Sequence, residues 1–139
     1  MTNKDVIITI KSVQSNDDDK SEIEVITQGV YQKTKEGFII TYDESDESGF
    51  DGASTTITTK HENEVSVQRT GSASSNLVIE KGKKHHCHYQ TPFGDLMVGI
   101  TTKKIKSSLA DKGGDLYLNY VVDINSSYVA EHELMVNIK

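Results

Sequence analysis

Hydrophobic and polar residues alternate along most of this chain. Val6, Ile8 and Ile10, for example, alternate with Ile7, Thr9 and Lys11. Residues two apart share one face of an extended strand, so this period predicts half-buried β-strands. The pattern recurs in ten segments, namely Val6–Lys11, Glu22–Tyr31, Gly37–Asp43, Thr55–Lys60, Glu64–Thr70, Leu77–Glu80, His85–Thr91, Leu96–Lys106, Asp115–Asp123 and Tyr128–Ile138. At Lys103–Lys112 the three-to-four spacing of Ile105, Leu109 and Lys112 allows a helical turn instead.

Short turn signals separate these segments, among them Asp51-Gly52, Lys81-Gly82 and Gly113-Gly114. Many short strands without helices for crossovers indicate an antiparallel sheet, and closing such a sheet removes its edges. The prediction is a single all-β domain over residues 1–139, an up-and-down antiparallel β-barrel of about 8–10 strands. A β-sandwich is the alternative, but consecutive short turns favour the barrel.

Composition agrees with strands and narrows the setting. Valine, isoleucine and threonine number 38, against 10 for leucine and alanine, and β-branched residues fit a pleated surface better than a helix. Cys87 is the single cysteine, so no internal disulfide framework is expected. The start Met1–Asp5 is polar, and no apolar run approaches the ~18–20 residues of a membrane helix. We therefore expect a cytoplasmic protein that does not engage a membrane.

Charge is unevenly distributed. The net charge is -6, and the acidic residues gather in two clusters, Asp17–Asp19 and Asp43–Asp51. Both clusters lie between alternating segments, so they are expected to be solvated hairpin loops. The second half of the chain carries a small basic excess.

Several pieces of the sequence, in order, resemble the YwiB-like proteins, a domain of unknown function from Gram-positive bacteria. The resemblance rests on Gly29 with Tyr31, Ile39–Glu44, Thr55–Ile57, Val67–Gly71, Leu77–Lys83, Tyr89–Gly94, Thr101-Thr102 and Gly114–Tyr120. It implies a calycin-like barrel, related in architecture to lipocalins and fatty-acid-binding proteins. It implies no activity, because the family has no assigned function.

Arg69 is the first candidate for a binding residue. It shares a strand face with Val65 and Val67, so it points inward if the valines do. A buried arginine needs an interior carboxylate, carbonyl groups or an anionic ligand, unless its head reaches solvent at the rim. Inward-facing tyrosines would line a cavity with Arg69 or simply fill it; they are Tyr31, Tyr42, Tyr89 and Tyr120. An interior filled by its own side chains, with Arg69 paired to a buried carboxylate, would overturn the hypothesis of a ligand in the barrel.

The run of histidines suggests a metal site. His86 and His88 project from one face of a strand and could bind a metal as a pair. A third ligand would have to come from elsewhere, such as His61, His132 or Glu131, and none has motif spacing. A solvated strand face is the plainer interpretation.

Six lysines form a candidate anion patch at one corner. If the chain turns at Pro92–Asp95, residues whose numbers sum to about 186 lie opposite each other, which brings Lys83 close to Lys103. The basic corner consists of Lys81, Lys83, Lys84, Lys103, Lys104 and Lys106. It would suit phosphate or an acidic partner, whereas the acidic net charge and the scarcity of aromatics disfavour nucleic acid. Lysines that protect a sheet edge are the stronger interpretation.

No catalytic constellation is present in the sequence, and no cofactor is predicted. There is no Gly-rich phosphate loop, nucleophile elbow or calcium-loop spacing. The leading expectation is a barrel that binds a small amphipathic or anionic ligand, and the oligomeric state stays open. The alternatives are a macromolecular interaction module at the basic corner and a metal-dependent activity at His86 and His88.

Overall fold

Ten β-strands account for most of the chain. The computed structural model describes residues 3–17, 19–44, 52–61, 63–71, 74–91, 94–124 and 127–139, with backbone alone at 3, 88–91, 95 and 128. The strands are β1 (Asn3–Ser15), β2 (Lys20–Lys33), β3 (Phe38–Asp43), β4 (Ala53–Lys60), β5 (Glu64–Gly71), β6 (Ser75–Glu80), β7 (Lys84–Thr91), β8 (Gly94–Ser107), β9 (Gly114–Ile124) and β10 (Ser127–Ile138). Each of the ten predicted segments coincides with one strand. In the part of the chain described, no helix is long and apolar enough to cross a membrane.

The helical turn that the spacing at Lys103–Lys112 allowed does not form. β8 continues to Ser107, and a tight loop follows, closed by backbone hydrogen bonds between Ala110 and Gly113 in both directions. Gly113 has a φ of 120°, in the left-handed region that glycine adopts without steric cost. The glycine pair therefore turns the chain, and the spacing of Ile105 and Leu109 reflects burial at a strand end.

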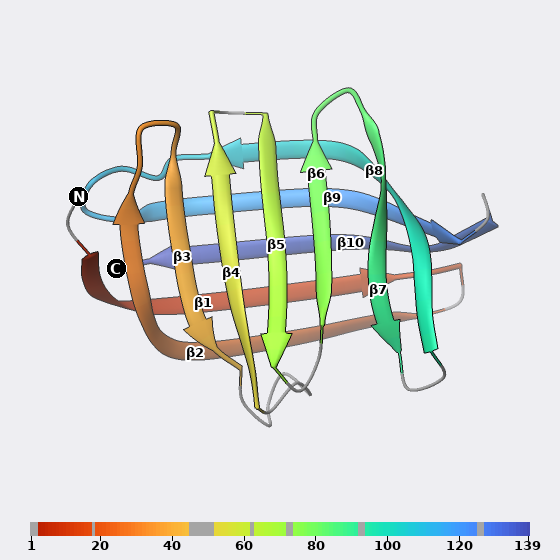
Figure 1. Cartoon of the computed structure of the whole chain (residues 1–139), viewed down its shortest axis with the longest axis horizontal. Coiled ribbons are helices and arrows are strands. Elements are labelled where there is room, and N and C mark those ends of the chain that lie inside the picture. The colour runs from red at the N-terminus through yellow and green to blue at the C-terminus, as the bar shows by residue number, and fades with distance from the viewer. Residues whose placement is uncertain are drawn as a thin grey trace.

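All ten strands form one closed barrel in up-and-down order. Each strand pairs antiparallel with its neighbours in sequence, and β1 pairs with β10 to close the ring. The predicted up-and-down barrel is confirmed. In Figure 1, β3 to β7 run roughly perpendicular to β1, β2, β9 and β10, so the barrel is flattened into two crossed layers.

Two strands pass from one layer to the other, and each has a glycine at the point of exchange. β2 pairs with β1 along its length and takes β3 as its second neighbour from Gly29 onward. β8 leaves β7 near Thr101 and takes β9 as neighbour from Gly99 onward. Figure 1 shows both strands bending between the layers. Glycine allows the close backbone approach that a barrel corner requires.

The interior consists of apolar side chains from both layers. Ile8, Ile40, Ile57, Ile79 and Leu118 are all 0% exposed. An internal cavity wide enough for water would leave accessible area on the side chains lining it. The described side chains therefore fill the apolar layers of the barrel, at a packing typical of protein cores.

The loop after β8 covers one end of this core. Tyr31 donates a hydrogen bond from its hydroxyl to the Ala110 carbonyl oxygen at 2.8 Å, and its ring stacks on Phe38 with centroids 5.1 Å apart. Lys33 forms an ion pair with Asp111 at 3.0 Å. Burial raises the pKa of Tyr31 to about 12, so the phenol stays protonated and donates. Tyr31 is thus part of the closure of this end.

Candidate functional site

A single cross-strand row marks the opposite end of the barrel interior. In the registers of β3 to β8, each member of this row lies directly opposite the next. We call it the mouth row; its members in order are Tyr42, Thr55, Arg69, Ser75, Tyr89 and Leu96. Most of these residues are polar, although the row faces the barrel interior.

The row beneath it is entirely apolar. Moving two residues inward along the same strands gives Ile40, Ile57, Val67, Leu77, Cys87 and Val98. Five of these are buried, at 8% exposure or less, and Leu77 is partly buried. The mouth row therefore forms the boundary between the apolar core and this end of the barrel.

Solvent reaches the inner face at this end. Leu96 lies on the same face of β8 as buried Val98, yet it is 37% exposed. Ile23 of β2 shares its face with buried Val25 and is 45% exposed. The exposure of Leu96 and Ile23 indicates where solvent reaches the inner face, whereas Tyr42, Thr55 and Ser75 of the mouth row are buried.

Arg69 is paired with a buried carboxylate, and together with the filled apolar layers this meets the condition that the sequence analysis set against a ligand deep in the barrel. Its Nη2 donates to Glu44 Oε2 at 3.3 Å, and the Thr55 hydroxyl donates to the same oxygen. The Glu44 side chain is 5% exposed and that of Arg69 is 17% exposed. We call the donor groups of Thr55 and Arg69, together with the Tyr42 phenol beside them, the carboxylate cradle.

Glu44 was missed because it belongs to the acidic cluster that the sequence analysis assigned to a solvated loop. That assignment is wrong for Glu44, whose side chain is 5% exposed and whose backbone N–H donates to the Ala53 carbonyl oxygen at 2.8 Å. The missed signal is the alternation itself, because Glu44 lies an even number of residues from Phe38, Ile40 and Tyr42 and therefore faces the same side of the strand. Residues 45–51 of the cluster lie outside the described residues.

Tyr42 is the third member of the cradle. Burial, first of all, and then the neighbouring Glu44 carboxylate raise the pKa of this phenol well above its usual range, against the opposing effect of Arg69. The phenol therefore stays protonated at any physiological pH. A guanidinium and a hydroxyl that donate to one carboxylate oxygen, with a protonated phenol beside them, are complementary to an oxyanion.

The other predicted tyrosines do not join this cradle. Tyr31 belongs to the closed end. Tyr120 stacks on His132, with ring centroids 5.2 Å apart and planes 3° from parallel. Tyr89 belongs to the mouth row by its backbone, and its side chain lies outside the described residues. Of the five predicted ligand-binding residues, the structure brings together Arg69 and Tyr42.

The metal hypothesis receives no support from the arrangement of the described side chains. His86 is exposed, and the side chain of His88 is not among those described. Of the suggested third ligands, His61 is in an exposed turn, His132 is stacked inside the barrel, and Glu131 accepts from Lys103. Among the described residues, no three His, Cys, Asp or Glu side chains are grouped to hold a metal.

The β7–β8 hairpin has a different register from the one expected. Lys84 lies opposite Thr101 and Thr91 opposite Gly94, so opposed residues sum to 185 rather than 186. Pro92 and Phe93, which the prediction placed in the turn, lie outside the described residues. The shift by one residue removes the direct opposition of Lys83 and Lys103.

Much of the basic corner is neutralised by nearby acids. Lys83 pairs with Glu80 at 3.5 Å, Lys84 with Asp123 at 2.9 Å, and Lys103 with Glu131 at 3.1 Å. The remaining members are the exposed Lys81, Lys104 and Lys106. Of these, Lys104 has its pKa lowered by the adjacent Lys106. Binding of a macromolecule at the basic corner stays a prediction.

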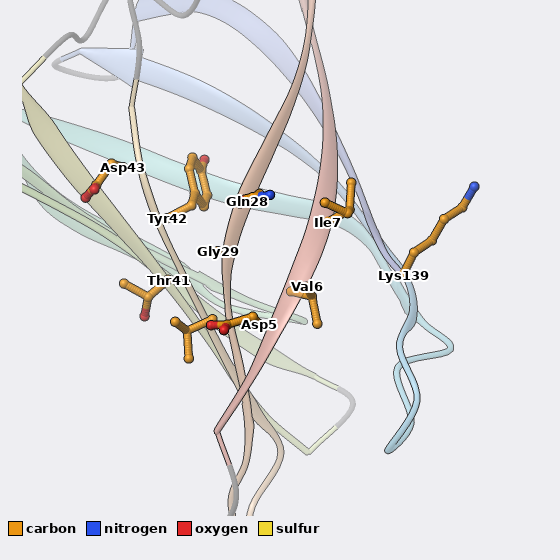
Figure 2. A pocket seen from close by; sticks show the side chains of 10 residues that line it. Asp5, Val6, Ile7, Gln28, Gly29, Thr41, Tyr42, Asp43 and Lys139 are labelled. Atoms are coloured by element: carbon orange, nitrogen blue, oxygen red, sulfur yellow. The ribbon is translucent and has the colours of Figure 1, made fainter.

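A pocket lies where β1, β2 and β3 meet at the Gly29 corner, and Tyr42 of the mouth row is among its lining residues. It is open and has a volume of about 590 Å³, and Lys139 lies at one side of it (Figure 2). Its charged groups include the carboxylates of Asp5 and Asp43, and Asp43 already accepts a hydrogen bond from the Ser54 hydroxyl at 2.7 Å. No pattern in the sequence predicts this pocket, because it arises from the bend of β2.

Comparison with known proteins identifies relatives over nearly the whole chain. The family model described as "Domain of unknown function (DUF1934)" matches residues 8–136. The "Uncharacterized beta-barrel protein YwiB" of Bacillus subtilis (strain 168) is 27% identical over 132 residues, which cover 94% of this chain and 90% of that protein. The crystal structure of the ywiB protein from Bacillus subtilis superposes with a TM-score of 0.85 at 23% identity, covering 99% of this chain and 92% of that one. That structure supports the fold.

Proposed function

Given that this chain belongs to the DUF1934 family, whose function is not assigned, we propose that it is a binding protein for a small amphipathic anion. The proposed site is the mouth row, with Arg69 as the partner of the anionic group. The observation that carries the proposal is the carboxylate cradle, in which Arg69 and Thr55 both donate to one carboxylate oxygen on the inner face of the barrel. Donors of this kind bind oxyanions strongly where water is partly excluded.

The proposed ligand lies at the opening rather than deep in the barrel. The apolar layers are filled by their own side chains, so a long chain has no space there. Ile23 and Leu96, which are on the inner face and exposed, offer apolar contact near the opening. A short apolar segment with one acid group fits this combination, as mouths of β-barrels commonly hold small ligands.

We place this activity in the cytoplasm as part of the same proposal. Cys87 is a free thiol, 4% exposed, whose pKa is raised by burial. A protonated, buried thiol is compatible with a reducing compartment and needs no disulfide partner.

Native mass spectrometry of untagged protein tests whether a ligand is retained from the cell. In parallel, ¹⁵N-labelled protein is titrated with octanoate, and with octanol as a probe of equal chain length but no charge. We expect saturable shifts of the Thr55, Arg69 and Ser75 amides with octanoate, in the millimolar range or tighter. Octanol should produce smaller shifts at these amides.

Two variants localise the binding. Arg69→Gln/Glu44→Gln replaces the ion pair by two neutral amides and should abolish the preference for octanoate over octanol. Lys103→Gln removes one positive charge outside the barrel mouth and should leave the preference unchanged. Equal binding of the two probes by the wild-type protein, or equal loss in both variants, would contradict the proposed site.

A further inference from the structure

The structure shows the carboxylate cradle already holding a carboxylate. Glu44 reaches it from the residue directly after β3, and its Oε2 takes the hydrogen bonds of Thr55 and Arg69. With 5% of its side chain exposed, Glu44 has largely exchanged water for these donors. A buried carboxylate persists only where donors and opposite charge replace its hydration.

We propose that Glu44 is an internal substitute for the acid group of the ligand, and that a monocarboxylate binds by displacing it from Arg69 and Thr55. This inference rests on the proposed function and adds two things to it. It names the ligand class as a carboxylic acid, because a carboxylate is the group that the cradle is seen to accommodate. It also makes Glu44 a positioning residue whose release accompanies binding.

The position of Glu44 in the chain suits such an exchange. Tyr42, Thr55 and Arg69 lie within β3, β4 and β5, whose ladder pairing fixes the backbone from which their side chains project. Glu44 lies one residue beyond the end of β3 and is tied to β4 by the backbone hydrogen bond to Ala53. Side-chain rotation alone can withdraw its carboxylate while the donors stay in place. The affinity of an external acid is then reduced by the fraction of molecules in which Glu44 occupies the cradle.

The test compares octanoate binding by wild-type protein, Glu44→Gln and Asp43→Asn, measured by isothermal titration calorimetry. Glu44→Gln removes the competing charge, and the octanoate dissociation constant should fall by about tenfold or more, the scale of one charge-assisted hydrogen bond. Asp43→Asn removes the same charge one residue away, from a side chain bonded to Ser54, and should leave the constant within about twofold. Octanol binding should be unchanged in both variants.

The outcomes separate this inference from the proposed function. Wild-type binding with no gain in Glu44→Gln overturns the displacement and leaves the proposed function standing. A gain for octanol equal to that for octanoate also overturns it, because the variant would then have opened space rather than freed a carboxylate site. Absence of octanoate binding in both folded proteins overturns the proposed function and this inference together.

A second variant covers the case in which Glu44→Gln does not fold. Glu44→Asp keeps the charge but shortens the side chain by one methylene, which withdraws the carboxylate from Arg69. We expect an intermediate gain in octanoate affinity, about threefold, if part of the competition is lost. An unchanged or weaker affinity in folded Glu44→Asp would contradict displacement.

Discussion

The two corner glycines should respond very differently to the same substitution by alanine. Neither Gly29 nor Gly99 has a positive φ, so alanine can adopt the backbone conformation at both positions. At both, alanine reduces the entropy of the unfolded chain, which by itself stabilises the fold by about 0.4–1 kcal/mol. The difference between the variants therefore reports what the new methyl group meets.

At Gly29 the methyl group meets atoms that cannot move away. A Cβ there would lie 2.4 Å from Ile8 Cδ1 and 2.5 Å from the carbonyl oxygen of Thr41. Ile8 is 0% exposed, and the Thr41 oxygen belongs to the backbone of the neighbouring strand. Overpacking of this kind costs about 1–3 kcal/mol and sometimes more. We expect Gly29→Ala to lower the free energy of unfolding by about 2 kcal/mol and Tm by about 8 °C.

At Gly99 the methyl group meets the far ends of two flexible side chains. Asp123 Oδ1 and Lys84 Cε would each be 2.6 Å away, and these residues form an ion pair across the glycine. The Lys84 side chain is 37% exposed and can turn into solvent, whereas the Asp123 carboxylate is largely buried at 13%. Displacing only the exposed lysine costs on the order of 1 kcal/mol, which the gain from alanine offsets. Gly99→Ala should stay within about 1 kcal/mol of wild type.

Urea denaturation followed by circular dichroism measures both free energies, with differential scanning calorimetry for Tm. Comparable m-values would show that the variants unfold from equally compact states. Equal losses in the two variants, or a larger loss in Gly99→Ala, would refute the argument that backbone contact at the β2 corner sets the cost.

Three further predictions concern the interior. Arg69→Gln should lower the free energy of unfolding, measured by urea denaturation, by about 3 kcal/mol because it leaves the Glu44 carboxylate buried without its cation. The double variant Arg69→Gln/Glu44→Gln should recover much of that loss, and no recovery would show that the two residues are not coupled. Burial lowers the pKa of His132, so as the pH falls the unfolded chain binds a proton at this residue before the folded protein does. The stability that the neutral ring contributes is therefore complete above about pH 6.5, and it is lost as the pH falls from there towards the lowered pKa. His132→Phe should flatten this part of the stability profile, and an unchanged profile would contradict it. Tyr31→Phe removes the hydrogen bond to the Ala110 carbonyl and should cost about 1 kcal/mol by thermal and urea melts, whereas no loss would mean that solvent replaces the bond fully.

The strands could be predicted because the rule that reveals them is local. Alternation depends on residues two apart, and the ten alternating segments became ten strands. Arg69 was placed on the inner face for the same reason, beside Val65 and Val67. The helical turn failed because a spacing of three to four residues near a strand end does not distinguish burial in a loop from burial on a helix.

Register and partners could not be predicted in the same way. The mouth row exists because five successive strand pairings align Tyr42 with Thr55, Arg69 and beyond, and each pairing depends on the length of the turn before it. An error of one residue in the length of a turn, as in the β7–β8 hairpin, changes which residues lie opposite each other and which of them share a face. Glu44 was missed because its acidic neighbours suggested a loop, although the alternation along β3 places it on the inner face.

The pairing that closes the barrel joins the two ends of the chain. Ile8 of β1 lies opposite Ile138 of β10, and the register continues to Ser15 opposite Glu131. On the ribosome, β1 therefore has β2 as its partner, and its other edge is covered only after β10 has been synthesised. Contacts so distant in sequence are slow to form, because the intervening chain must be ordered first. Ring closure is consequently a late event in the biogenesis of this protein, and a nascent chain arrested before β10 exposes the edges of β1 and β9 to neighbouring chains.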